Sequence, residues 1–552
     1  MTGFIQKISG NRRTIFIIFL MLVLIQLFGY LYLYNRANWI TPPGRVHAIQ
    51  NVDAYYPDVI RQSKLGAWAH TYSLTTYPTP AIYTYLFFIG AGKIAAIFNI
   101  DPLVMYEMTR ITGGIAVFIC TYWLIIVMIP LNLQIPAMFF TIAMETGPAW
   151  KNFLDTPISG WAAALPPQAL IARHFGLPHH LWAEALGLAL VAMIIKTIKK
   201  PSLWLPVVVL SLAIAGPLTN PTFFLILITC LFTPWLLYAA KTGAFRQTFF
   251  PIALAVFGIG IVGLFTQSQF SAGAPWKYVL ESEKSWWTTD YIMVPFVQSF
   301  GLFYPFVALL LILVPFGWKR WSRTMQQLFI LTFCWSVLPV GLIYLSAFPW
   351  IPLVNGRIAS DLSPIPIGLL ATLSIYAVGQ IPLYRRYLTR LVMVLLVFGV
   401  ILSASLSVVY FMQTMQLQDL AVDHEGDSFT HYPTRNLWDG MMELKHVPVW
   451  SHVMILPRVG DIITAFVPLR VYQGEPHDGD IHWLAQRGWS HQFYTGEMPL
   501  ESLRKFFTEN AISYVFLGPE EKYAVLTRTF YPDVLEVIYT NPEVTIFKVK
   551  NL

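Results

Sequence analysis

Long apolar runs alternate with short polar segments over roughly the first three quarters of the chain. The first run, residues 14–34, has about 21 uncharged residues, enough to cross a bilayer as a helix. Further apolar runs begin near Ile111, Ile135, Leu181, Leu203, Phe223, Phe250, Val294, Leu328, Pro364 and Leu391. The pattern predicts an all-α polytopic membrane protein with about eleven transmembrane helices over residues 1–412.

A different pattern begins near residue 413. Its periodicity predicts a helix over residues 500–510 and strands over residues 449–456, 512–517, 534–539 and 544–549, the last two forming a hairpin. We expect residues 413–552 to form a small, separately folded α/β domain. It has no Gly-rich phosphate loop, so we expect this domain to cover the outer face of the membrane region and not to carry catalytic residues of its own.

Basic residues mark the expected inner loops. Besides the N-terminus, four clusters lie between apolar runs: Lys196, Lys199 and Lys200; Lys241 and Arg246; Lys319, Arg320 and Arg323; Arg385, Arg386 and Arg390. Positive charge stays on the cytoplasmic side of a membrane. We therefore expect a protein of the cytoplasmic (inner) membrane with its N-terminus in the cytoplasm and its C-terminal domain outside.

Residues 80–99 are apolar enough to span, but they contain Lys93 and several glycines. Counting them as a span would place Lys196–Lys200 outside. We interpret them as an interfacial helix on the outer face. The alternative is that they span and a weak later segment does not.

Composition excludes other classes of protein. Hydrophobic residues make up 56% and charged residues 12% of the chain, about half the charge of a soluble domain. The 15% of aromatic residues exclude disorder. A net charge of +7 without long basic runs does not indicate nucleic-acid binding. Each of the three cysteines lies in an apolar run and is interpreted as a core residue.

The expected outer loops, residues 35–103, 148–178, 267–293 and 347–362, carry the candidate chemistry. In the first, Asp53 precedes a helix expected from about Ala54 to Trp68, where it is either a reactive carboxylate or simply the helix N-cap. Asp58 falls on another face of that helix. We keep it as a substrate-binding candidate, although a solvated position is the simpler interpretation.

The other outer loops supply cations and aromatic rings. Arg173, His174, His179 and His180 lie within eight residues and could hold a phosphate, or merely anchor the chain at the interface. Trp286 and Trp287 could stack on a sugar ring or belong to an interfacial belt. Arg357 is a further phosphate candidate, with an ion pair to Asp361 as the alternative.

One class of reaction needs both a carboxylate and cationic side chains on the same face of a membrane. Cations stabilise a departing lipid phosphate, and a carboxylate removes the proton of an acceptor hydroxyl. The spacing of these residues matches no zinc pattern. We therefore predict no metal site, although a divalent metal remains an alternative.

The chain resembles the GT-C superfamily, integral-membrane glycosyltransferases that use polyprenyl-phosphate sugars. The resemblance rests on the first-loop acid, the interfacial helix, the many spans and the external C-terminal domain. More narrowly, it is similar to uncharacterised bacterial membrane proteins grouped beside the protein mannosyltransferase-like and lipopolysaccharide galacturonosyltransferase-like families. The similar segments are residues 53–62, 177–180, 220–223, 471–474 and 514–520.

The resemblance implies that Asp53 is a general base or metal-site residue. Many members have adjacent acidic residues at this point, where this chain has Val52 and Ala54. The predicted function is therefore transfer of a sugar from a polyprenyl-phosphate donor to an unidentified glycan, lipid or protein acceptor of the envelope. The alternatives are a transporter or flippase of lipid-linked glycans, which needs ionisable residues buried mid-span, and a non-catalytic scaffold.

Overall fold

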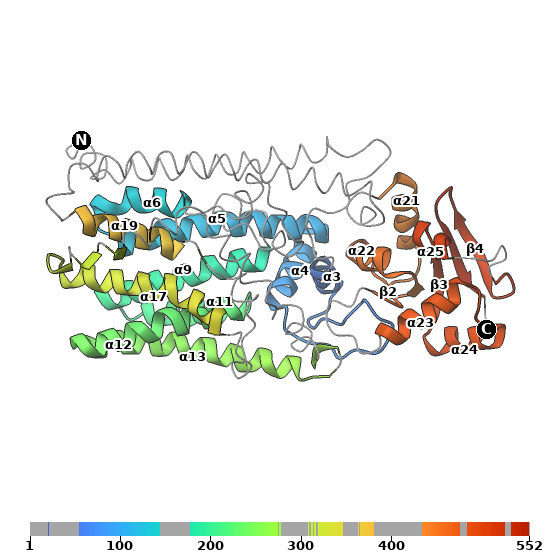
Figure 1. The fold of residues 1–552 in the computed structure, drawn as a ribbon. Helices are drawn as coiled ribbons and strands as arrows, with labels where there is room; N and C mark the ends of the chain where they lie inside the picture. Colours follow the sequence, from blue (N-terminus) through green and yellow to red (C-terminus); the bar gives the residue numbers. More distant parts are fainter. Residues whose placement is uncertain are drawn as a thin grey trace. The chain divides into compact units, whose positions relative to one another are not determined.

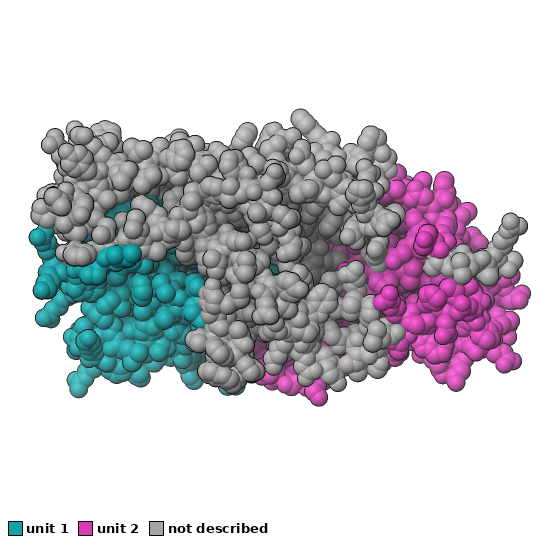
Figure 2. Space-filling view, in the orientation of Figure 1, with its two compact units in different colours: residues 1–32, 110–265, 284–414 teal, residues 33–109, 266–283, 415–552 magenta. Residues whose placement is uncertain are grey.

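A computed structural model describes most of the helical core and most of the C-terminal region (Figure 1). The described residues are 20, 55–143, 177–273, 275–277, 307, 311–312, 314–315, 318–345, 363, 365–379, 433–474, 483–524 and 531–550. The chain forms two compact units, coloured in Figure 2. The helical unit comprises residues 1–32, 110–265 and 284–414, and the α/β unit comprises residues 33–109, 266–283 and 415–552.

Long apolar helices build the helical unit. Within the described residues, five helical stretches are long and apolar enough to cross a membrane: α5 (Pro102–Met128), α9 (Pro178–Lys199), Pro221–Thr242, α13 (Phe245–Phe270) and the residues Arg323–Leu342 of α17 (Arg323–Leu345). Shorter helices are α6 (Gln134–Ala143), α10 (Leu205–Ala215) and α19 (Ile365–Gly379). The protein is thus a mostly helical, multi-pass membrane protein. The three spans expected near residues 14–34, Val294 and Leu391 lie wholly or mostly outside the described residues.

The stretch Pro221–Thr242 has a local irregularity with a chemical cause. It consists of α11 (Pro221–Leu227), a π-helical turn η3 (Ile228–Phe232) and α12 (Thr233–Thr242). Pro234 has no N–H to donate to the preceding turn, which disfavours regular α-helical pairing there. The hydroxyl of Thr233 donates instead to the carbonyl oxygen of Ile228 at 2.9 Å. Gly243, with φ +77°, then ends α12 in a left-handed cap.

Contacts inside the helical unit show the direction of successive helices. α9 and α11 begin side by side, because Asn220 and His180 are hydrogen-bonded at 3.3 Å. At the other end of α9, the Lys199 amine donates to the carbonyl oxygen of Val127 near the end of α5. α19 begins at the His180 end, since the Ser363 hydroxyl donates to Glu184 on α9.

These contacts place the ends of the helices in two groups. The helices α5, α9, α11–α12 and α19 run one way, while α17 brings Trp335 and Ser336 in its second half beside the start of α11 and so runs the other way. Lys199, Lys241 and Arg323 consequently share the end opposite His180. The sequence predicted this alternation from the positions of the basic clusters.

The α/β unit is built on a five-stranded sheet of order β2-β1-β3-β5-β4. The strands β1 (His452–Met454), β2 (Arg470–Val471) and β3 (Ile512–Leu517) are parallel, and β5 (Thr545–Val549) pairs antiparallel with β3 and with β4 (Leu535–Thr540). The helices around it are α21 (Arg435–Glu443), α22 (Pro457–Phe466), α23 (Trp483–Tyr494), α24 (Leu500–Glu509) and α25 (Pro519–Ala524). The predicted strand over residues 512–517, the helix from Leu500 and the terminal hairpin are confirmed.

The first predicted outer loop is part of this same unit. Residues 73–75 lie along the free edge of β2, where the amide of Val471 donates to the carbonyl of Ser73 and that of Gly474 to Leu74. One hydrophobic core contains Val59 and Ile60 together with Ile463. The expectation of a separately folded C-terminal domain therefore needs a correction: its core is completed by a segment about 400 residues earlier in the chain. The predicted boundary at residues 412 and 413 lies outside the described residues.

Two helices of this loop pack closely. They are α3 (Tyr55–Lys64) and α4 (Leu86–Phe98). The 13 residues of α4 extend for about 20 Å, short of the roughly 30 Å hydrocarbon core. This length supports the interpretation of residues 80–99 as an interfacial rather than a spanning segment.

Candidate functional site

The structure describes three of the predicted site residues: Asp58, His179 and His180. The other six, Asp53, Arg173, His174, Trp286, Trp287 and Arg357, lie outside the described residues. Their proposed roles are therefore still predictions from the sequence.

His179 and His180 lie in the first turn of α9. Pro178 starts this helix, where its missing N–H would have no helical partner in any case. The two imidazole rings meet edge to face, with centroids 4.4 Å apart. The ring Nδ1 of His180 lies 3.3 Å from Nδ2 of Asn220, the residue that caps α11. Polar side chains thus gather at the N-terminal end of α9, where the helix dipole favours an anion.

A buried carboxyl lies one turn further along α9. Glu184 is 1% exposed, and its Oε1 accepts a hydrogen bond from the Ser363 hydroxyl at 2.5 Å. Because Glu184 follows His180 by four residues, the two side chains lie on one face of α9. Neither Glu184 nor Ser363 is among the site residues predicted from the sequence. The four-residue spacing between His180 and Glu184 was the signal that could have indicated Glu184.

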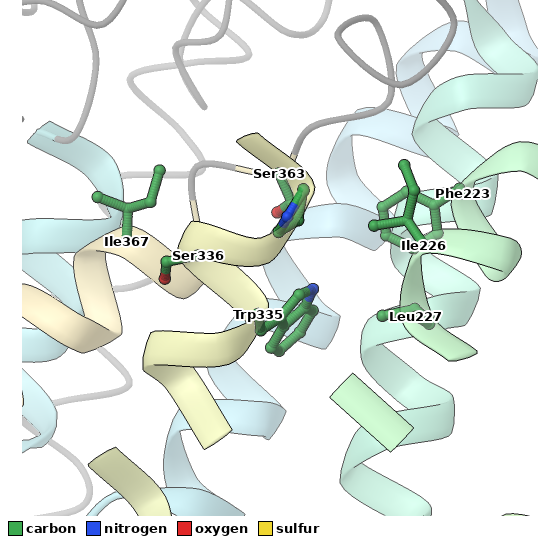
Figure 3. A pocket seen from close by; sticks show the side chains of 8 residues that line it. Phe223, Ile226, Leu227, Trp335, Ser336, Ser363 and Ile367 are labelled. Carbon is green, nitrogen blue, oxygen red and sulfur yellow. The ribbon is translucent and has the colours of Figure 1, made fainter. Parts of the chain in front are cut away.

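Ser363 also lines a small cavity (Figure 3). The cavity lies between α11, α17 and α19 and has room for about one water-sized group. Most of its lining residues are apolar, among them Phe223, Trp335 and Ile367. The hydroxyls of Ser336 and Ser363 both donate to acceptors within the protein.

Asp58 does not occupy a solvated helix face, so that expectation is wrong. It is 1% exposed and accepts hydrogen bonds from Ser73 at 2.6 Å and Gln62 at 2.9 Å. Arg61 forms an ion pair with it at 3.4 Å. Burial raises the pKa of Asp58, whereas Arg61, Ser73 and Gln62 act in the opposite direction. The side chain fastens α3 within the α/β unit.

A buried histidine holds the beginning of α3. The Nδ1 of His70 lies 3.2 Å from the hydroxyl of Tyr55, the first residue of α3. The imidazole also meets the rings of Tyr85 and Trp276 edge to face. Burial lowers the pKa of His70 to about 3, so this imidazole is neutral at physiological pH. The start of α3 is therefore fixed, two residues after Asp53 in the sequence.

The described part of the chain contains no cluster of metal-binding side chains. There, no three His, Cys, Asp or Glu side chains come together in a way that could hold an ion. Cys230 is buried, and Cys120 and Cys334 are partly buried; none of the three forms a disulfide.

Comparison with known proteins adds information at the level of the fold. No protein-family model and no curated protein sequence matches this chain. Among solved structures, ArnT from Cupriavidus metallidurans bound to undecaprenyl phosphate matches with a TM-score of 0.51 and 11% identity, over 98% of this chain and 98% of that chain. ArnT in the apo state matches with a TM-score of 0.48 and 12% identity, over 95% and 97%.

An archaeal structure is similar over a smaller share of its own length. The apo oligosaccharyltransferase of Archaeoglobus fulgidus gives a TM-score of 0.49 at 11% identity, over 92% of this chain and 70% of that chain. Identities this low show the fold alone, and the ArnT complex aligns along nearly the whole of both chains. This chain therefore shares its fold with ArnT from Cupriavidus metallidurans.

Proposed function

We propose that this protein is a membrane glycosyltransferase that transfers a sugar from a polyprenyl-phosphate donor to an acceptor of the cell envelope. The fold it shares with ArnT, a protein solved with undecaprenyl phosphate, supports a lipid-phosphate ligand. A multi-pass helical unit suits such a donor, because its hydrocarbon tail must enter from the bilayer.

The observation that carries the proposal is the polar end of the apolar helical unit. His179, His180 and Asn220 meet at the start of α9, and Glu184 and Ser363 follow one turn below. A phosphate head group would find imidazoles and a helix N-terminus there.

In the proposed reaction the acceptor hydroxyl attacks the anomeric carbon while the donor's phosphate departs. Asp53 acts as general base and takes the hydroxyl proton. Arg173, His174, His179, His180 and Arg357 are the candidates that stabilise the charge on the departing lipid phosphate. Trp286 and Trp287 would stack on the sugar. A direct displacement of this kind inverts the anomeric configuration.

The proposed location is the outer face of the cytoplasmic membrane. Lys199, Lys241 and Arg323 share one end of the helical unit, and positive charge favours the cytoplasm for that end. The His180 end then faces outward.

The position of Glu184 favours a transferase over a transporter of lipid-linked glycans. A transport pathway needs ionisable residues near the middle of the membrane. Glu184 is the seventh residue of the 22-residue helix α9, near the end that carries His179 and His180. It therefore belongs with the polar end of the unit.

The test is transfer by purified Asp53→Asn. Removing a general base lowers a rate by about 10²–10⁴-fold, so transfer from a polyprenyl-phosphate sugar should fall by that factor. The matched control is Asp101→Asn in the same predicted loop. Asp101 accepts the amide of Leu103 at 2.9 Å, and asparagine caps a helix equally well. Near-normal transfer by Asp53→Asn would refute the base assignment.

A further inference from the structure

Helix α22 of the C-terminal region is held at both ends by buried ionisable side chains. Its C-terminal end meets Arg61 of α3, and its N-terminal end meets Glu521 of α25. All of these residues belong to the α/β unit. The arrangement connects the sheet of the C-terminal region to the helix that follows Asp53.

The contact at the C-terminal end of α22 is a guanidinium fork. Arg61 is 5% exposed and donates to the carbonyl oxygens of Thr464, Ala465 and Val467, the last at 3.1 Å. Carbonyls in the last turn of a helix have no helical partner and carry partial negative charge, so a cation is favourable there. Asp58 holds the guanidinium from the other side at 3.4 Å. The planar fork with several donors cannot be reproduced by an ammonium group.

The contact at the N-terminal end of α22 links two strands of the sheet. Glu521 is fully buried, and its two oxygens accept the amides of Leu456 and Gly518, at 2.8 and 2.9 Å. Leu456 is the N-cap of α22 after β1, and Gly518 follows β3. One carboxyl thus ties the start of α22 to the ends of two parallel strands.

We propose that α22 is the element through which the C-terminal sheet sets the position of α3, and that Arg61 is a positioning residue for the carboxylate that precedes α3. The second half of this proposal rests on the function proposed for Asp53. A displacement of α22 then moves α3 with it, whereas a local loss of packing under α24 does not. The C-terminal region is an integral part of the active-site support and not merely its cover.

Burial of the Arg61–Asp58 pair dictates how it is tested. Removing Arg61 alone leaves the carboxylate of Asp58 buried with Arg470 as its remaining cation, and breaking a buried pair in this way by itself destabilises a protein. The double variant Asp58→Asn with Arg61→Met removes both charges of the pair, and asparagine still accepts from Ser73 or Gln62. We expect this variant to lose the fork to α22 and to keep its fold.

A control variant should weaken the C-terminal region without touching α22 or α3. Leu503→Ala on α24 does this, because Leu503 belongs to a separate core cluster on the sheet. Both variants are compared with the wild-type full-length protein in lipid vesicles. The measurements are amide hydrogen exchange over α3 and α24, and kcat and KM for the lipid-linked donor.

We expect the double variant to speed exchange in α3 by about tenfold or more and leave α24 unchanged. Its kcat should fall by about 10- to 100-fold with little change in KM, as for a displaced catalytic group. Leu503→Ala should speed exchange in α24 only and leave kcat unchanged. A merely structural role for Arg61 would change thermal stability without this split between kcat and KM.

Two results would overturn the proposal. Unchanged exchange in α3 of the double variant would show that α22 does not hold that helix. Faster exchange in α3 with wild-type kcat would show that Arg61 has no positioning role. Failure of the proposed function is a separate outcome: Asp53→Asn would then retain transfer, while the exchange data would still decide whether α22 and α3 are coupled.

Discussion

Buried ionisable side chains in the α/β unit have opposite sensitivities to pH. Burial lowers the pKa of His70 to about 3 and raises the pKa of Glu521 to about 8. For Glu521, Glu520 adds to the effect of burial, whereas the amides of Leu456 and Gly518 favour the charged form. Both side chains are therefore neutral just below pH 7, although one is an acid and the other a base.

The raised pKa of Glu521 predicts a loss of stability as pH rises. Between the unfolded pKa near 4.5 and the folded pKa of about 8, the folded state binds more protons than the unfolded state. The contribution of Glu521 to the free energy of unfolding should therefore fall across this window, by up to about 1.4 kcal/mol per pH unit. The Glu521→Gln variant lacks this pH-dependent contribution. Thermal unfolding of the wild-type protein and of Glu521→Gln, measured from pH 5 to pH 8, tests the difference.

The control for this experiment is Glu536→Gln, on the exposed strand β4. It should keep the pH dependence of the wild-type protein. If the curves of wild-type protein and Glu521→Gln run parallel, Glu521 is already ionised in the folded state.

At the scale of elements, the packing of α3 on α4 depends on one glycine. A Cβ atom at Gly92 would lie 2.4 Å from the carbonyl oxygen of Ile60 and 2.5 Å from Cβ of Ser63. The backbones of the two helices approach so closely that no other residue fits. The Ser63 hydroxyl also donates to the carbonyl of Ile89, which strengthens the contact.

Gly92→Ala should therefore destabilise the protein, by about 1–3 kcal/mol, because α4 must move away from α3. Gly90→Ala is the matched control on the same helix, since a Cβ there meets nothing within 4 Å. It should be neutral or stabilising by up to about 1 kcal/mol, the helix propensity difference between alanine and glycine. Thermal unfolding of the two variants compares them. Equal stabilities would show that the two helices do not pack through Gly92.

At the scale of the whole molecule, the arrangement of charges predicts the topology. We expect Lys199, Arg320 and Arg386 to lie in the cytoplasm and the C-terminal region outside. The measurement is labelling with a membrane-impermeant thiol reagent, after replacing Cys120, Cys230 and Cys334 by alanine. Lys199→Cys, Arg320→Cys and Arg386→Cys should react only in permeabilised cells.

Tyr523→Cys is the control for labelling from outside, because Tyr523 is 93% exposed on the C-terminal region. It should react in spheroplasts, where the outer face of the membrane is open to the reagent. Labelling of position 199 from outside would mean that residues 80–99 span the membrane.

Local sequence patterns were enough to predict a multi-pass membrane protein and much of its secondary structure. The length of an apolar run predicts a membrane helix, because the bilayer has a fixed thickness. The positions of basic residues predict the direction in which each helix runs, because positively charged loops stay on the cytoplasmic side. The strand Ile512–Leu517 and the helix from Leu500 were predictable because local periodicity matches their burial.

Contacts between residues far apart in the sequence could not be predicted and depend on the fold. Arg61 and Val467 are about 400 residues apart, and nothing local indicates that a charged residue of α3 ends among the carbonyls of α22. Asp58 looked solvated because helical periodicity shows which residues share a face but not what covers it. Likewise, Ser363 meets Glu184 only because the fold brings the residue two positions before α19 against α9. Burial of polar groups depends on partners brought together by the fold, and these partners are absent from any local window of sequence.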